Sequence, residues 1–231
     1  KIVSLLRYES SLQEKGELTS LEDYIARMKQ EQKDIYYLSG ESRQTLLNNP
    51  NLEYFSKNGI EVLLLIDPVD IFTFPSIGEY KGKTIKSADN ADIDLKPEEK
   101  IEKPKDALSQ GLISLFKEAL KEKVADVIVS KRLVSSAATL VATKDSPDAQ
   151  MEKIMKAMDK NFTASKKIME INTEHPLIRN LSKIYMQDSN SPLLKTCILQ
   201  LYEGSLLIEG NLSSPADFIK RMSDIMQEAT K

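Results

Sequence analysis

The last forty or so residues of the chain carry two amphipathic helical patterns in succession, over residues 191–210 and 214–231. Each pattern opens with serine and then proline, a capping residue followed by a residue whose fixed φ suits the first helical turn. Apolar residues recur every three or four positions in both. The two stripes are Leu194, Ile198, Leu201, Ser205 and Ile208 in the first helix, and Phe218, Ile219, Met222, Ile225 and Met226 in the second.

Two arrangements of this hairpin are open. Burying about eight to ten such side chains, at roughly 1.5–3 kcal/mol each, releases on the order of 15–25 kcal/mol before costs. Because joining two chains costs roughly 4–15 kcal/mol, a symmetric four-helix dimer is accessible. The alternative is that both faces pack inside their own domain. The dimer interpretation assigns the interface to Leu194, Ile198, Leu201, Ile208, Phe218, Met222 and Ile225.

Composition favours a helical core and excludes several classes of function. Hydrophobic residues make up 41% of the 231 residues, but only 6% are aromatic and none is tryptophan, which favours an interior of Leu, Ile and Met. A net charge of −3 leaves no basic field for nucleic acid. The sequence contains no run of eighteen apolar residues, so it predicts no membrane-spanning helix. Cys197 is the only cysteine of the sequence, which excludes a disulfide framework and fits a cytoplasmic protein.

The first part of the chain predicts an α/β unit over about residues 20–85. Ser20 followed by Asp23 is a capping pattern. The unbroken aliphatic run at residues 60–66 is typical of a strand buried on both faces of a parallel sheet. The predicted order is a helix from Ser20, a strand at 34–38, a helix at 41–57 bent or broken at Asn49-Pro50, a strand at 60–66 and a helix from Asp67-Pro68.

The second part begins after a charged segment with two prolines at residues 96–106, which predicts a linker. The start of the chain, residues 1–7, looks like the tail of a helix without a signal peptide, so we expect a piece of a longer protein. The expected fold is α+β: a small α/β/α subdomain over residues 1–95, then a mixed helical domain with a small sheet over 107–231. Its predicted elements are helices at 107–121, 147–158 and 176–186, strands at 124–129, 133–141 and 167–171, and the terminal hairpin.

One segment approaches a nucleotide-binding motif. Residues 78–84 read Gly-Glu-Tyr-Lys-Gly-Lys-Thr, one residue shorter than a phosphate-binding loop. Loop length matters because consecutive backbone N–H groups must wrap one phosphate. No buried strand precedes the segment and no apolar helix follows it. A turn leading into an edge strand is therefore favoured, and a nucleotide-using enzyme centred on Gly82-Lys83-Thr84 is the alternative.

Other catalytic chemistry is not indicated. His175 is the only histidine, so a zinc cluster of histidines and cysteines is excluded. A nucleophilic pair of Cys197 with His175 is disfavoured, because the cysteine lies on an apolar stripe and His175 precedes Pro176, where it caps or packs a helix. The sequence predicts no catalytic, cofactor or metal site.

The predicted helix at residues 147–158 carries an apolar stripe rich in methionine. Unbranched thioethers adapt to varied partners. The stripe is either ordinary core or an exposed surface for apolar segments of other proteins. Phe72, Phe74 and Ile77 form a second cluster with the same ambiguity. The stripe consists of Met151, Ile154, Met155 and Met158, opposite Glu152, Lys153, Lys156 and Asp159.

Several segments together, in order along the chain, resemble the heat-shock protein 90 family of chaperones, in its bacterial type. Residues 20–38 and 59–70 resemble the family's middle region. The resemblance to its C-terminal domain lies in residues 132–134, 137–141, 151–157, 170–178 and 218–222. The match covers nearly all of the chain and is far more specific than any single motif.

The resemblance implies an activity and its partners. The family's ATP-binding domain, which uses ATP with magnesium, and the arginine that reaches the ATP would precede residue 1, so this chain is expected to be no enzyme and to hold no cofactor. The family dimerises through its last two helices, and its methionine helix contacts unfolded or partly folded clients. Client contact is thereby assigned to Phe72, Met151, Ile154 and Met155, with Met158 added on helical geometry. A scaffold without client binding is the remaining alternative.

Overall fold

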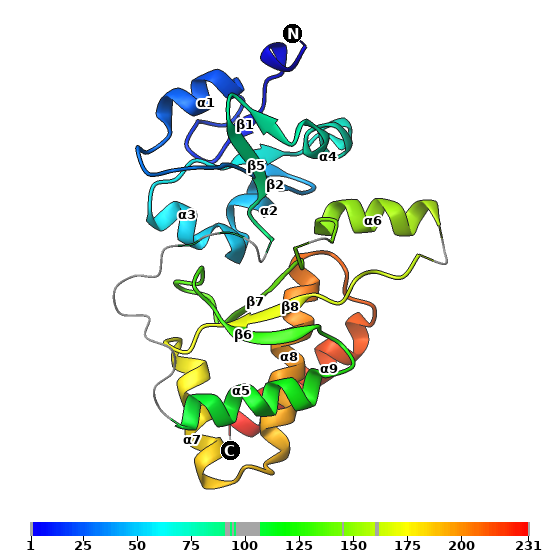
Figure 1. Cartoon of the computed structure of the whole chain (residues 1–231). Coiled ribbons are helices and arrows are strands. Elements are labelled where there is room, and N and C mark those ends of the chain that lie inside the picture. Colours follow the sequence, from blue (N-terminus) through cyan, green and yellow to red (C-terminus); the bar gives the residue numbers. More distant parts are fainter. Residues whose placement is uncertain are drawn as a thin grey trace. The chain divides into compact units, whose positions relative to one another are not determined.

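A computed structural model of the chain describes residues 2–90, 93, 95, 107–144, 146–159 and 162–230. Two compact units are present, each combining helices with a small sheet (Figure 1). Unit 1 consists of Lys1–Asp94 with Ala142–Ser165, and unit 2 of Leu95–Val141 with Lys166–Lys231. The α+β class is confirmed. The predicted linker at 96–106 lies outside the described residues.

Unit 1 is built on a five-stranded sheet with the order β1-β3-β2-β5-β4. The central strand β2 runs parallel to both β3 and β5, and its Tyr37 lies opposite Leu63 on one side and Ser87 on the other. This confirms the parallel pairing that the aliphatic run at 60–66 predicts. Both edge strands, β1 and β4, are antiparallel to their neighbours. The strands are β1 (Glu9–Ser10), β2 (Ile35–Ser39), β3 (Leu63–Leu65), β4 (Glu79–Tyr80) and β5 (Lys83–Ser87).

Short helices surround this sheet. At the start of α1, Asp23 N donates to Ser20 Oγ at 3.1 Å and Ser20 N donates to Asp23 Oδ2 at 3.3 Å, which confirms the capping pattern. The helix predicted over 41–57 is broken at Pro50 into two helices joined by a 3-10 turn. The helices of unit 1 are α1 (Leu21–Arg27), α2 (Arg43–Leu47), α3 (Glu53–Lys57), α4 (Pro68–Thr73) and α6 (Ala149–Met158), with 3-10 turns η1 (Val3–Leu5), η2 (Pro50–Leu52) and η3 (Pro75–Ile77).

Phe74 belongs to the core of unit 1. It is completely buried and packs edge-on against Tyr8 and Tyr37, with ring centroids 4.8 Å and 5.3 Å away. Ile77 is partly buried against the same cluster. Of the second apolar cluster in the sequence, only Phe72 is therefore exposed.

Unit 2 contains a three-stranded sheet, β6-β8-β7, in which β6 is parallel and β7 antiparallel to the central β8. Helix α8 packs on β7, α5 packs on β6, and α5 contacts both α7 and α8 (Figure 1). Helix α9 packs on α8. The elements are β6 (Asp126–Val129), β7 (Ala138–Val141), β8 (Ile168–Ile171), α5 (Ala107–Leu120), α7 (Pro176–Gln187), α8 (Pro192–Ile208) and α9 (Pro215–Ala229).

The structure differs from the sequence-based expectation at two places. Strand β1 at Glu9–Ser10 is not among the predicted elements, because two residues are too few to show an alternating pattern. Residues 142–165, which the sequence places with the C-terminal domain, contact unit 1: Ala142 N donates to Asp89 O at 2.8 Å, and Lys153 pairs with Glu41 at 2.7 Å. As folding domains, the ranges 1–95 and 107–231 stay a prediction.

Candidate functional site

Helix α6 carries the predicted client-binding stripe, and polar contacts fix it to unit 1. Asp148 is its N-cap residue, and Oδ1 of this carboxylate accepts a hydrogen bond from Met151 N at 2.8 Å. The fully buried positions of the helix are Ala149 and Glu152. Glu152 Oε1 accepts a hydrogen bond from Ser165 N at 3.2 Å. The side of α6 that faces its own unit is therefore small or charged.

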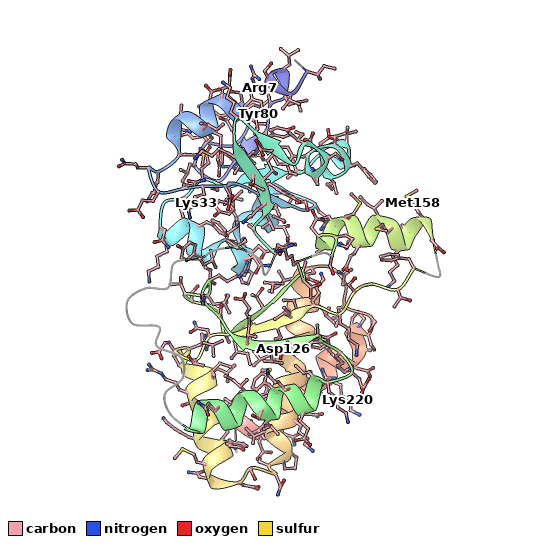
Figure 2. The ribbon with its side chains drawn as sticks, in the orientation of Figure 1. Arg7, Lys33, Tyr80, Asp126, Met158 and Lys220 are labelled. Carbon is pink, nitrogen blue, oxygen red and sulfur yellow. The ribbon has the colours of Figure 1, made fainter. Side chains whose placement is uncertain are left out.

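The methionine stripe lies partly in solvent. Met151 and Ile154 are half-buried, whereas 37% of Met155 and 80% of Met158 are exposed. Figure 2 shows Met158 at the C-terminal end of α6. An ordinary core helix would bury these thioethers and expose the carboxylate of Glu152. The core interpretation therefore fails for Met155 and Met158.

Phe72 lies on a helix that neighbours α6. Asp67 is the N-cap residue of helix α4, and its Oδ1 accepts a hydrogen bond from Val69 N at 2.9 Å. The helix buries Ile71 in unit 1. Phe72 is 44% exposed and Val69 is also exposed. Helices α4 and α6 contact each other, so the structure brings together two segments that lie far apart in the sequence. We define the α4–α6 surface as Val69, Phe72, Met151, Ile154, Met155 and Met158.

The terminal hairpin is fixed by ion pairs. Arg221 on α9 reaches Glu203 on α8 with two hydrogen bonds, Nη1 to Oε2 at 2.6 Å and Nη2 to Oε1 at 3.3 Å. At the end of α8, the ammonium of Lys167 lies 3.0 Å from Glu209 Oε2, and both side chains are largely buried. Gly210 has φ +70° in the turn that follows, a conformation that favours glycine. The Arg221–Glu203 pair thus fixes α9 against α8, and the Lys167–Glu209 pair joins the end of α8 to the residue before β8.

The residues predicted for a dimer interface fall into two groups. Leu194 and Ile198 are 0% exposed and belong to the core of unit 2, because this part of α8 packs on β7 and α5. Both side chains are covered inside unit 2, and their assignment to an interface stays a prediction. The remaining five are half-buried or exposed: Leu201, Ile208, Phe218, Met222 and Ile225.

Helix α9 has no fully buried residue. Its apolar stripe and the end of α8 expose several large side chains, which is uncommon on a monomeric protein surface. Sequence reasoning assigned two of them to the interface and missed Leu207, which lies outside the three-four stripe. We define the α8–α9 surface as Leu207, Ile208, Ile219, Met222 and Met226.

The segment 78–84 is a hairpin turn. Lys81 and Gly82 have φ of +49° and +76°, as in the tight turns that join antiparallel strands, here β4 and β5. The Lys83 ammonium donates to Gln32 O at 3.2 Å, so it is bound to the protein backbone. The favoured turn is confirmed, but the edge strand is β4, since β5 pairs with β2 as well. The nucleotide-binding alternative gains no support.

His175 and Cys197 have structural roles. His175 Nδ1 accepts a hydrogen bond from Leu177 N at 3.1 Å, which confirms the capping interpretation. Burial raises the pKa of the Cys197 thiol, so it stays protonated and weakly nucleophilic. Within the described ranges, no three His, Cys, Asp or Glu side chains are grouped to hold a metal ion. The described helices also include none that is long and apolar enough to cross a membrane.

Comparisons with known proteins agree on one family. The sequence model described as "Hsp90 protein" matches residues 1–231. The chaperone protein HtpG of Chlorobium phaeovibrioides is 50% identical over 232 residues, which cover 100% of this chain and 37% of that protein. HtpG of Chlorobaculum tepidum is 48% identical (100% and 37%), and HtpG of Geobacter sulfurreducens is 36% identical (98% and 36%). The chain thus spans about 37% of the length of these relatives.

Leu194 is expected to behave as a core residue. Leu194→Ala leaves a cavity between α8 and its neighbours and should lower the free energy of unfolding by about 2–5 kcal/mol. Leu177→Ala, at an exposed leucine of the same unit, should change it by less than about 1 kcal/mol. Denaturant unfolding at one fixed protein concentration measures both. Equal, small effects would contradict the placement of Leu194.

Proposed function

Because the chain belongs to the Hsp90 protein family, we propose that it supplies two protein-binding surfaces to a chaperone. The α4–α6 surface binds unfolded or partly folded client proteins. The α8–α9 surface joins two copies of the chain. We assign no catalytic step to these residues: in the full-length protein, ATP with magnesium would act in the part of the relatives' length that this chain does not cover.

The orientation of α6 carries the client-binding proposal. The helix turns the carboxylate of Glu152 toward unit 1 and leaves Met155 and Met158 in water. Exposed apolar area of this kind is costly in a protein that has no use for it. Flexible thioether side chains suit partners of varied sequence, since they repack against different apolar groups. An unfolded protein presents such groups in many sequences.

The rest of the α4–α6 surface fits the same partner. Phe72 adds an aromatic ring on the neighbouring helix, and Val69 extends the apolar area to the start of α4. Lys153 pairs with Glu41 at 2.7 Å beside the helix, which gives the surface a polar border. An apolar surface with a charged border suits weak binding of exposed hydrophobic segments with little sequence preference.

The dimer proposal rests on the α8–α9 surface. Two copies would contribute about ten exposed apolar side chains, each worth on the order of 1 kcal/mol because only part of it is still in water. The gross gain of roughly 10 kcal/mol is smaller than full burial of both stripes would give, since Leu194 and Ile198 are already covered. This gain is comparable with the roughly 4–15 kcal/mol that association of two chains costs. The dimer should therefore dissociate readily on dilution.

The dimer surface can be tested with point variants on α9. Light scattering at about 50 µM is expected to give the mass of a dimer for the parent chain and of a monomer for the double variant Ile219→Glu with Met222→Glu, because paired carboxylates cannot be buried without partners. Lys220→Glu changes an exposed residue of the same helix (Figure 2) and should leave the dimer intact. A monomeric parent, or a dimer that survives the double variant, would contradict the proposal.

The client surface can be tested by removing thioethers without shortening side chains. The double variant Met155→Gln with Met158→Gln keeps side-chain length and helix propensity but makes the surface polar. We expect about tenfold weaker binding of an unfolded model protein, measured by fluorescence anisotropy, from the loss of roughly 1 kcal/mol or less at each position. Met186→Gln, at an exposed methionine of α7, is the matched control. Unchanged binding in the double variant would contradict the assignment of client contact to Met155 and Met158, and no binding by the parent chain would favour a scaffold without client binding.

A further inference from the structure

Two buried carboxylates meet at the first turn of α6. Asp148 precedes the helix and Asp89 follows strand β5, and they are 7% and 6% exposed. Asp148 Oδ1 accepts a hydrogen bond from Met151 N at 2.8 Å, and Asp89 Oδ2 accepts one from Ala149 N at 3.5 Å. Two side chains from distant parts of the sequence therefore receive the free N–H groups of one helix end.

Asp89 also joins this helix end to the sheet of unit 1. The hydroxyl of Ser87, the last residue of β5, donates to Asp89 Oδ1 at 2.5 Å. Ala142 N donates to Asp89 O at 2.8 Å, and Asn90 forms an isolated parallel bridge with Ala142. The segment that leads into α6 is thus bonded to the end of a sheet strand. These contacts hold the start of α6 against the sheet of unit 1.

The charged and titratable groups around the pair come from three sides. Tyr37 of β2, Lys86 of β5 and Lys144 of the segment before α6 line a cavity of about 260 Å³ together with both carboxylates. The ammonium of Lys86 is paired with Asp34 at 3.1 Å. Farther along α6, Glu152 accepts from Ser165 N and Lys153 pairs with Glu41. Tyr37 stays a neutral phenol, because burial and then the charges of Asp148 and Asp89 raise its pKa.

Asp148 holds its proton more tightly than an ordinary carboxyl group, because its pKa is raised. Burial raises the pKa of Asp148 from 3.8 to about 6, and the negative charge of Asp89 adds to the shift. The hydrogen bond from Met151 N acts in the opposite direction but is the weaker influence. A raised pKa in the folded state means that this proton stabilises the fold fully below about pH 3.8. That contribution is lost as the pH rises through about 6.

We propose that Asp89 and Asp148 are the positioning residues of α6, and that a proton on Asp148, beside the carboxylate of Asp89, controls how firmly the start of this helix is bound to the rest of unit 1. With the proton, one neutral and one charged carboxyl group share the helix end. Without it, two buried negative charges repel each other, which partly offsets their attraction to the helix N–H groups. The description of α6 as a client-binding helix rests on the proposed function, but its positioning does not.

Hydrogen exchange of the α6 amides tests this proposal in the whole chain. After correction for intrinsic exchange rates, protection of the amides from Glu152 to Met155 should be about tenfold higher at pH 5.0 than at pH 7.5, as expected for a pKa that rises from 3.8 to about 6 on folding. Asp148→Asn keeps the N-cap oxygen without a charge and should abolish this difference. Asp89→Asn removes the repulsion and should move the midpoint to a lower pH.

Asp67→Asn is the matched control, because Asp67 caps α4 with an exposed carboxylate and should leave the profile of α6 unchanged. Equal protection of α6 at both pH values in the parent chain would overturn the proposal. So would a tenfold difference that persists in Asp148→Asn. The experiment contains no client, so failure of client binding and failure of the positioning role give separate results.

Discussion

Hydrogen bonds at one end of α6 decide which face of the helix meets water. Asp148 and Asp89 receive N–H groups of its first turn, and Glu152 receives Ser165 N. A helix bound to its unit by polar contacts does not need to bury its apolar stripe there. Met155 and Met158 of this stripe stay exposed, and Phe72 on the neighbouring α4 is exposed as well. The proposed client surface would thus follow from the polar contacts that hold one short helix.

In the terminal hairpin, the two ends of helix α8 differ in burial. The first half of α8 packs on β7 and α5 and contributes Leu194 and Ile198 to the core. The end of α8 and the outer stripe of α9 are exposed at Leu207, Ile208, Ile219, Met222 and Met226, although Ile225 of α9 packs against the core. Ion pairs, chiefly Arg221 with Glu203, fix α9 against α8 without burying its outer stripe. One part of the hairpin thus packs in the core of unit 2, and the other part is exposed. A surface for a second copy requires such an exposed part.

Local chemistry made much of this fold predictable from sequence. The Ser20–Asp23 cap and the aliphatic run at 60–66 each act within a few residues, and the structure contains both. Helices α8 and α9 also begin at their Ser-Pro pairs, although neither serine side chain accepts the capping hydrogen bond that the pattern predicts. Periodicity locates a stripe but does not say whether that stripe faces inward. Met155 and Leu194 lie on equally clear stripes, yet one is exposed and the other buried. The Asp89–Asp148 pair could not be predicted from the sequence, because only the fold brings these two residues together.

Methyl NMR of methionine-labelled protein can locate a bound client on the chain, since each methionine reports its own surroundings. On addition of a permanently unfolded protein, the signals of Met155 and Met158 should shift or broaden, while that of Met169, buried in unit 2, should stay unchanged. Binding that leaves both α6 signals in place would contradict the proposed client surface, because the client would then lie elsewhere on the chain.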